Sequence, residues 1–167
     1  FGRNPAGALA KAWQRLILAG AQVGGTETYR HDLVNVGRQY LAEQAGARYD
    51  QAVAAQRAGD AARFRSATQA FLETLGDLDH LLAADRHFLL GRWLEDAKRW
   101  GETDAERAKM EWNARRVLTL WGQGTPLRDY AWKEWAGLVD GFYAKRWELF
   151  FRRQAEALDA GQPFDQT

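Results

Sequence analysis

The sequence predicts an all-α protein, an irregular antiparallel bundle of about six to seven helices joined by short connections. Apolar residues recur at spacings of three and four over most of the chain, which is the period of a helix with one buried face. Alternating runs of Val, Ile and Thr, which would indicate strands, are absent. All three prolines fall where helices are expected to start or end or where loops are expected, so the helices between them can be long.

The composition is that of one folded domain, residues 1–167. Hydrophobic residues make up 46% of the chain and charged residues 27%, values that exclude a disordered protein. The net charge is +1, with basic and acidic residues interleaved, which argues against a nucleic-acid partner. No cysteine is present, which excludes disulfides and cysteine-ligated metals.

The sequence gives little information on cellular location. It contains no run long and apolar enough for a membrane span and no pattern of a signal peptide. The chain opens on Phe1 rather than on Met, so we interpret it as a fragment or a processed product. The compartment therefore stays unknown, and a secreted or periplasmic parent protein is compatible with the sequence.

The first three helices follow from capping residues and apolar spacing. Asn4 and Pro5 predict a helix start, and the glycines at 20–25 predict its end. A second helix is expected from about Thr28 to Ala58, roughly 30 residues and about 45 Å long. Gly59–Asp60 then predict a stop and a new N-cap. The buried faces are expected to consist of Leu9, Trp13, Leu16 and Ile17 in the first helix, Leu33, Val36, Tyr40, Ala47 and Ala54 in the second, and Phe64, Ala67, Phe71, Leu75, Leu78 and Leu82 in the third.

Two further helices are expected before residue 121. Asp85 is predicted to cap the fourth helix and Gly101 to end it. Thr103 and Glu106 match the capping box at the start of the fifth helix. The expected buried faces are Leu89, Leu90, Trp93, Leu94, Ala97 and Trp100 in the fourth helix, and Met110, Ala114, Val117, Leu118 and Trp121 in the fifth.

The C-terminal part predicts one long helix or two. Asp129 is the expected cap of a sixth helix, and Gly141 either kinks that helix or separates a seventh from it. The stretch 161–163 then ends the helical pattern. The apolar residues of this part are Trp132, Trp135, Ala136, Val139, Phe142, Tyr143, Trp147, Phe150, Phe151 and Leu158.

The stretch from Leu118 to Tyr130 is the candidate binding segment. Two glycines and a proline interrupt the helical pattern there, with Trp121 at one edge and Tyr130 at the other. Loops held by rigid elements often carry binding residues, and flat aromatic side chains can stack on sugar rings. Trp121 and Tyr130 are therefore candidates for ligand contact, whereas most of the other aromatic residues are expected in the core.

The titratable residues do not predict a catalytic set or a metal site. Asp77 and His80 share one face of the third helix, but a helical metal site needs further ligands from other helices. We interpret the histidines as surface or boundary residues and expect no metal and no cofactor. Asp129 and Glu134 flank the candidate segment, and Asp129 is interpreted as a helix cap. The single serine, Ser66, has no histidine near it in the sequence.

Three long motifs resemble one known family. The stretches LTLWGQGTPLRDYAWKEWAGLVDGFYAKRWELFF, HFLLGRWLEDAK and YRHDLVNVGRQYL resemble the C-terminal helical domain of the α-N-acetylglucosaminidases, glycoside hydrolase family 89. The resemblance extends from about Trp13 to Pro163. It implies enzymes that remove terminal α-linked N-acetylglucosamine from glycans with retention of configuration. It also implies that the catalytic glutamates lie in an upstream (β/α)8 domain of the same polypeptide, so that this chain alone is inactive.

The resemblance also implies which residues contact the substrate. Trp121, Leu127 and Tyr130 match family positions that line the sugar pocket: Trp121 and Leu127 would form an apolar wall, and Tyr130 would offer a hydroxyl. The chain departs from the family at His31, where Tyr is frequent, and at residues 132–134. The sequence leaves one alternative open, a non-catalytic helical domain that binds a protein or a glycan through exposed aromatic residues.

Overall fold

The structure, a computed structural model, describes residues 7–120, 132–162 and 164. This part of the chain contains six α-helices, one 3₁₀ turn and one π-helical segment. Within these ranges no strand forms, and a single isolated bridge joins Leu89 to Ala136. The predicted all-α fold class and number of helices are therefore confirmed. None of the described helices combines the length and the apolar character that crossing a membrane requires.

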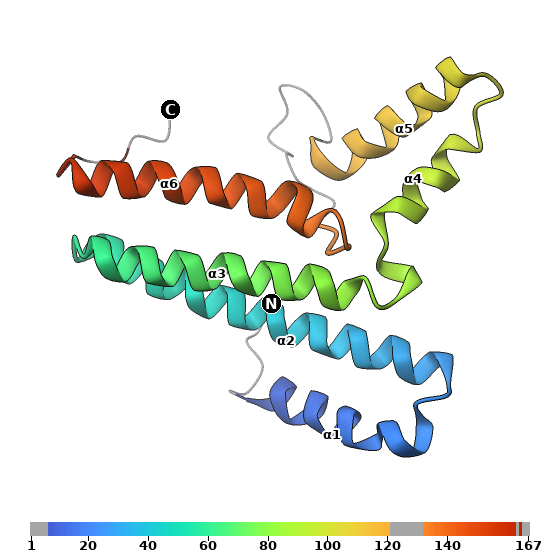
Figure 1. Ribbon diagram of the computed structural model, residues 1–167, viewed down its shortest axis with the longest axis horizontal. Helices are drawn as coiled ribbons and strands as arrows, with labels where there is room; N and C mark the ends of the chain where they lie inside the picture. The colour runs from blue at the N-terminus through green and yellow to red at the C-terminus, as the bar shows by residue number, and fades with distance from the viewer. Residues whose placement is uncertain (1–6, 121–131, 163, 165–167) are drawn as a thin grey trace.

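The N-terminal part consists of three successive antiparallel helices: α1 (Ala8–Val23), α2 (Glu27–Arg57) and α3 (Ala61–Leu82). Figure 1 shows α2 and α3 side by side along their lengths, with α1 against the first part of α2. At 31 residues α2 is about 46 Å long, as predicted. The predicted cap of α3 is also confirmed, since the Asp60 carboxylate accepts the amide of Arg63 at 2.9 Å.

The start of α1 differs from the prediction. Gly7 has a φ of 79°, a left-handed conformation that interrupts a right-handed helix, so α1 begins at Ala8 and not at Pro5. Asn4 and Pro5 themselves lie outside the described residues. Ile17 is exposed rather than buried, because α1 packs mainly on α2 and only one narrow face is covered.

The core lies between α2, α3 and the last helix, α6 (Lys145–Asp159). Every residue predicted for the inner face of α3 is buried. The Phe71 ring of α3 lies 5.2 Å from that of Trp147 and 5.3 Å from that of Phe151, both on α6. The side chains that α2 contributes to this core are mostly small, which allows α3 to approach closely: Ala45, Ala52 and Ala55.

The alanines buried on α2 are not those predicted. Ala47 and Ala54 are exposed, and their places are taken by the alanines named above. Alanines follow one another so closely in this half of α2 that apolar spacing does not single out one face.

The next two helices, α4 (Leu90–Lys98) and α5 (Asp104–Thr119), form a hairpin that extends away from α1–α3 (Figure 1). The predicted capping box of Thr103 and Glu106 is present. Trp100 was predicted to be buried but is 82% exposed, because α4 ends at Lys98 and Trp100 lies in the turn beyond it.

Asp85 is a cap, but of a different element than predicted. Its carboxylate accepts the amide of His87 at 2.8 Å and so caps a 3₁₀ turn, η1 (Arg86–Phe88). Helix α4 starts only after this turn, with Leu89 in extended conformation at its N-cap.

The predicted sixth helix starting at Asp129 is wrong where the structure describes it. Residues 132–135 have no helical structure, Ala136 forms the isolated bridge, and Gly137 has a φ of 84°. The chain becomes helical only in the π-helical segment η2 (Val139–Ala144), which contains Gly141 and continues into α6. Asp129 lies outside the described residues. The end of α6 is as predicted, with Gly161 at a φ of 63°.

Candidate functional site

The candidate binding segment itself is only partly described. Trp121, Leu127 and Tyr130 lie outside the described residues, so their roles stay predictions. The structure does describe the two ends between which residues 121–131 run, namely the end of α5 and the stretch 132–138. Contacts with other parts of the chain hold both of these ends in place.

The first end is fixed by the contact between α4 and α5. The Trp93 indole nitrogen donates to the Ala114 carbonyl at 3.3 Å, and Leu118, one turn further along α5, is 2% exposed. Two other apolar residues near this end, Val117 and Leu120, are exposed. The end of α5 therefore has one anchored face and one apolar face that is open to a partner or a ligand.

The second end is held first by an ion pair to α2. Arg38 contacts the Glu134 carboxylate, and the Asn35 side-chain oxygen accepts from the same guanidinium at 2.9 and 3.1 Å. The hydrogen bonds with Asn35 thus hold the Arg38 guanidinium in the orientation in which it contacts Glu134. Two residues earlier, Trp132 is 82% exposed and has a φ of 45°, which is unusual for a bulky side chain.

A backbone contact provides the second attachment. Ala136 accepts the amide of Leu90 at 3.1 Å and donates its own amide to the Phe88 carbonyl at 2.7 Å. Next to this bridge, the rings of Trp135 and Trp93 lie 5.8 Å apart. Trp93 therefore contacts both flanking stretches of the candidate segment, α5 through Ala114 and residues 132–138 through Trp135.

Asp79 of α3 provides the third attachment. Its carboxylate accepts the amide of Gly137 at 2.8 Å and that of Asp140 at 3.0 Å. These amides stand at the beginning of η2, where backbone donors lack partners within the helix, so Asp79 acts as a cap supplied from another helix. Sequence reasoning missed this role, because Asp79 is distant in sequence and looks like an ordinary surface residue of α3.

An apolar groove of about 780 Å³ opens beside the second end. Trp132 and Glu134 line it on one side, and residues of α2, α3, η2 and α6 line the rest. Its walls combine aromatic rings with a few charged groups, the mixture expected where a ligand or another domain binds. These include Tyr143, Trp147, Phe150, Phe164, Arg146 and Arg153.

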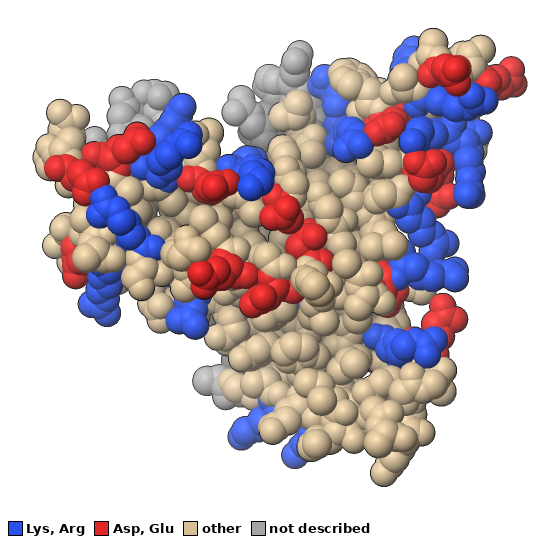
Figure 2. Space-filling model, in the orientation of Figure 1, with Lys and Arg blue, Asp and Glu red and all other residues tan. Residues whose placement is uncertain are grey.

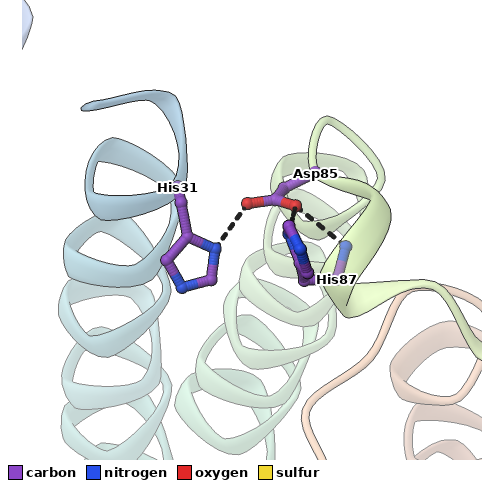
Figure 3. Close-up of side chains that lie close together, drawn as sticks. All are labelled: His31, Asp85 and His87. Atoms are coloured by element: carbon purple, nitrogen blue, oxygen red, sulfur yellow. Dashed lines mark hydrogen bonds and ion pairs between the residues drawn. The ribbon is translucent and has the colours of Figure 1, made fainter. Parts of the chain in front are cut away.

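The histidines are arranged differently from the prediction. Asp77 and His80 are exposed on α3 and do not join a cluster. Instead His31 of α2 meets Asp85 and His87 of η1, a grouping hidden in the sequence because 54 residues separate His31 from Asp85 (Figure 3). Each histidine Nδ1 lies 2.7 Å from one oxygen of the Asp85 carboxylate.

The surroundings of Asp85 lower the pKa of its carboxyl group, which favours the ionised form. Burial alone would raise this pKa, but the hydrogen bonds from the His87 amide and from the His87 and His31 rings outweigh burial and hold it below its usual value. An ionised carboxylate can only accept hydrogen bonds, so both histidines carry a proton on Nδ1.

The described residues around the candidate segment offer binding surfaces rather than a catalytic pair. The sequence singled out Asp129 and Glu134 as carboxylates beside the candidate segment, and of these only Glu134 is described. Glu134 forms an ion pair with Arg38, which attaches the chain to α2. The arrangement fixes the two flanking stretches, the end of α5 and residues 132–138, and the groove can accept an apolar partner. Among the described residues that line the groove, Glu134 is the one with a carboxylate.

Comparison with known proteins gives a consistent result. Residues 4–167 match the family model described as the alpha-N-acetylglucosaminidase (NAGLU) C-terminal domain. The chain is 36% identical over 157 residues to the human alpha-N-acetylglucosaminidase, covering 93% of this chain and 21% of that protein. It also resembles a family 89 glycoside hydrolase from Clostridium perfringens solved in complex with 2-acetamido-1,2-dideoxynojirmycin, with a TM-score of 0.88, 27% identity, and coverage of 94% of this chain and 19% of that one.

A second structure of the Clostridium perfringens enzyme, in complex with its substrate GlcNAc-alpha-1,4-galactose, matches equally well. The TM-score is 0.88 at 27% identity, over 94% of this chain and 18% of that one. The chain therefore spans about a fifth of the length of the relatives it matches.

Proposed function

Since the chain belongs to the family of alpha-N-acetylglucosaminidase C-terminal domains, we propose that it forms one wall of the substrate pocket in a larger α-N-acetylglucosaminidase. The observation that carries this proposal is the match over nearly the whole chain. The rigid attachment of both ends of residues 121–131 supports it, because a pocket wall must present its side chains at a fixed place.

The proposed ligand is a terminal α-linked N-acetylglucosamine of a glycan. One structure of the Clostridium perfringens enzyme is named with GlcNAc-alpha-1,4-galactose as its substrate, and the other is in complex with 2-acetamido-1,2-dideoxynojirmycin. Trp121 and Leu127 are the proposed apolar contacts, and Tyr130 is the proposed hydroxyl contact. Aromatic faces suit the apolar faces of sugar rings, which makes Trp121 the contact with the largest expected contribution.

The groups that act as acid and nucleophile are proposed to lie in an upstream (β/α)8 domain of the same polypeptide. The relatives are about five times as long as this chain, which leaves ample length for such a domain. The described residues beside the candidate segment supply no facing carboxylates. The role of this domain is then to close one side of the pocket and to support the barrel.

The exposed apolar residues near the candidate segment support docking of that barrel. Val117, Leu120 and Trp132 surround the two ends of residues 121–131, and the apolar groove continues this surface. An isolated domain would gain nothing by exposing so many apolar side chains around one place. We propose that the upstream domain covers them.

Enzyme assays with an aryl α-N-acetylglucosaminide test the proposal. The 167-residue chain alone is expected to be inactive, and the full-length enzyme to be active. In the full-length enzyme, Trp121→Ala should lower kcat/KM about tenfold or more, which corresponds to the loss of roughly 1.4 kcal/mol of transition-state binding. Turnover by the isolated chain would contradict the location of the catalytic groups.

Trp112→Ala is the matched control for Trp121→Ala. Trp112 is an exposed tryptophan of α5 that lies two turns before the end of this helix, with Arg116 over its ring. Its removal should leave kcat/KM unchanged. Equal kcat/KM values of the two variants would contradict the proposed contact between Trp121 and the substrate.

A second candidate function rests on a separate surface. Ile17, Leu18 and Val23 of α1 are exposed, and the face of α1 shown in Figure 2 carries few charged side chains compared with α4 and α5. This surface would suit an independent protein or glycan partner. Leu18→Glu in the full-length enzyme distinguishes the two: activity is retained if α1 binds another partner, and reduced if α1 packs on the barrel.

A further inference from the structure

The cluster of His31, Asp85 and His87 offers more than hydrogen bonds. Figure 3 shows the Asp85 carboxylate between the two imidazole rings, one from the beginning of α2 and the other from η1. One ligand atom from each of the three residues lies within 4.8 Å of the other two. Two imidazole nitrogens and a carboxylate are a common ligand set for zinc and related ions.

We propose that His31, Asp85 and His87 form a binding site for a divalent transition-metal ion of the zinc class. In this site the ion lies between the two Nδ1 atoms and the Asp85 carboxylate, and each imidazole carries its proton on Nε2 instead of Nδ1, which frees the Nδ1 lone pair for the ion. The ion therefore links α2 to the 3₁₀ turn more strongly than the hydrogen bonds do. Three protein ligands leave a fourth position for water.

The geometry requires only a small adjustment. With zinc bonds of about 2.0–2.1 Å, tetrahedral ligands stand roughly 3.3 Å apart. The Nδ1–oxygen distances of 2.7 Å must widen slightly, and the two imidazole nitrogens must approach each other by up to about 1.5 Å from the 4.8 Å limit. The side chains of His31 and His87 are 38% and 45% exposed, so both rings have room for this movement.

Neighbouring contacts hold the ligands near their places. The His31 ring stacks on Phe88 at 5.3 Å with an interplanar angle of 4°, which fixes its plane. Asp85 is only 8% exposed and one of its oxygens also accepts the His87 amide, so its carboxylate is oriented by the backbone. Supporting contacts of this kind raise the affinity of metal ligands.

The two histidines are reached from solvent, since their side chains are 38% and 45% exposed. His87 also borders a shallow pocket of about 180 Å³ together with Arg92 and Asp96. Arg86 and Arg92 add positive charge there, which disfavours a cation, and Asp96 offsets part of it. The buried negative charge of Asp85 is closer to the ion than any of these groups and dominates the local field.

Zinc titration of the 167-residue chain tests the site. After treatment with a chelator and its removal, zinc chloride should bind one ion per chain in calorimetry and raise the Tm. Cobalt chloride should produce visible absorption bands typical of a site with nitrogen and oxygen ligands. Binding weaker than about 1 mM would overturn the proposal.

Three variants separate the metal site from a purely hydrogen-bonded cluster. His31→Phe keeps a ring to stack on Phe88 but removes the ligand, and His87→Gln removes the second; each should weaken zinc binding about tenfold or more. His80→Gln is the control, because His80 is the only other histidine of the chain and is exposed on α3. Zinc affinity that is unchanged in His31→Phe and His87→Gln would overturn the proposal.

Imidazole nitrogen NMR gives a measurement on the unaltered chain. The chain has only three histidines, so their resonances can be assigned individually. Zinc should shift the Nδ1 signals of His31 and His87 and leave those of His80 in place. A zinc-dependent shift confined to His80, or no shift at all, would contradict the assignment.

Discussion

In the layer of α2, α3 and α6, side chains are held by contacts between apolar surfaces, whereas residues 132–138 are held by a few directional polar bonds. Phe64, Phe71 and Phe151 pack ring against ring in the first region. In the second, Arg38 pairs with Glu134, and Asp79 caps Gly137. Burial of apolar surface contributes a large stabilising free energy that depends little on orientation. Each polar contact contributes less, but its geometry fixes the position of the groups that it joins.

This difference separates stability from placement. Changes in the layer should lower the free energy of unfolding of the whole domain. Changes in the polar attachments should leave most of that free energy intact and alter the position of residues 121–131. The following predictions test this separation, from the largest expected effect to the smallest.

Phe71→Ala should have the largest effect. The Phe71 side chain is 5% exposed and contacts Tyr49, Trp147 and Phe151, so its truncation leaves a cavity. We expect a loss of about 3–5 kcal/mol in the free energy of unfolding, measured by urea denaturation. Trp100→Ala removes a larger but exposed side chain and should change stability by about 0.5 kcal/mol or less. Similar losses in both variants would remove the distinction between the two regions.

Gly37→Ala should have the next largest effect, at the contact between α1 and α2. A Cβ added at Gly37 would lie 2.6 Å from the Trp13 ring and 2.8 Å from the Leu81 side chain. Overpacking of this kind costs about 1–3 kcal/mol, again measured by urea denaturation.

Gly46→Ala is the control in the same helix. A Cβ at Gly46 meets nothing within 4 Å, so the better helix propensity of Ala should stabilise the domain by about 0.5–1 kcal/mol. The two substitutions are chemically identical and should have opposite signs. Effects of the same sign would show that close packing of α1 on α2 is not what requires Gly37.

Asp79→Ala tests a polar attachment. Loss of this cap should cost about 1 kcal/mol, typical of a helix cap, and should speed hydrogen exchange of the Gly137 and Asp140 amides. In the full-length enzyme kcat/KM should also fall, because the candidate segment loses a fixed end. Asp77→Ala, two residues away on the same helix and exposed, should change none of these quantities. Unchanged exchange in Asp79→Ala would contradict the capping role.

The smallest expected effect concerns the tip of the hairpin. Hydrogen bonds from the Thr103 and Glu102 amides lower the pKa of Glu106. Because the folded-state pKa lies below the unfolded one, this contribution is complete above the unfolded pKa and is lost as the pH falls through the folded pKa. The protection of the amides in the first turn of α5 against hydrogen exchange should therefore fall in acid, after correction for the pH dependence of exchange in an unstructured chain. Glu106→Gln should lack this pH dependence, and a dependence that persists in Glu106→Gln would have another origin.

The sequence predicted those elements whose cause is local. The capping box of α5 and the cap at Asp60 each depend on residues three apart, and both are present. All six residues predicted for the buried face of α3 are buried, because large apolar residues mark that face, and only Thr68 was missed there. On α2 the buried face was misassigned, since alanines occur on several faces of the helix.

The remaining errors come from contacts between distant residues. The stretch 132–138 has a helical apolar pattern, yet Asp79 and the Leu89–Ala136 bridge hold it in another conformation. The convergence of His31 on Asp85 likewise depends on the packing of α2 against the end of α3. For the candidate site, the ends of the segment are described, while the roles of Trp121, Leu127 and Tyr130 stay predictions based on resemblance.

The position of α6 in the core has a consequence for synthesis on the ribosome. The apolar face of α3, including Phe71, is complete when Leu82 has been made, but Trp147 and Phe151, which cover it, come much later in the chain. At about 5–20 residues per second, that interval lasts about 3–14 seconds. During this time the nascent chain exposes an aromatic stripe, so we expect this domain to depend on chaperones that bind emerging apolar segments more than a domain whose neighbours in space are neighbours in sequence.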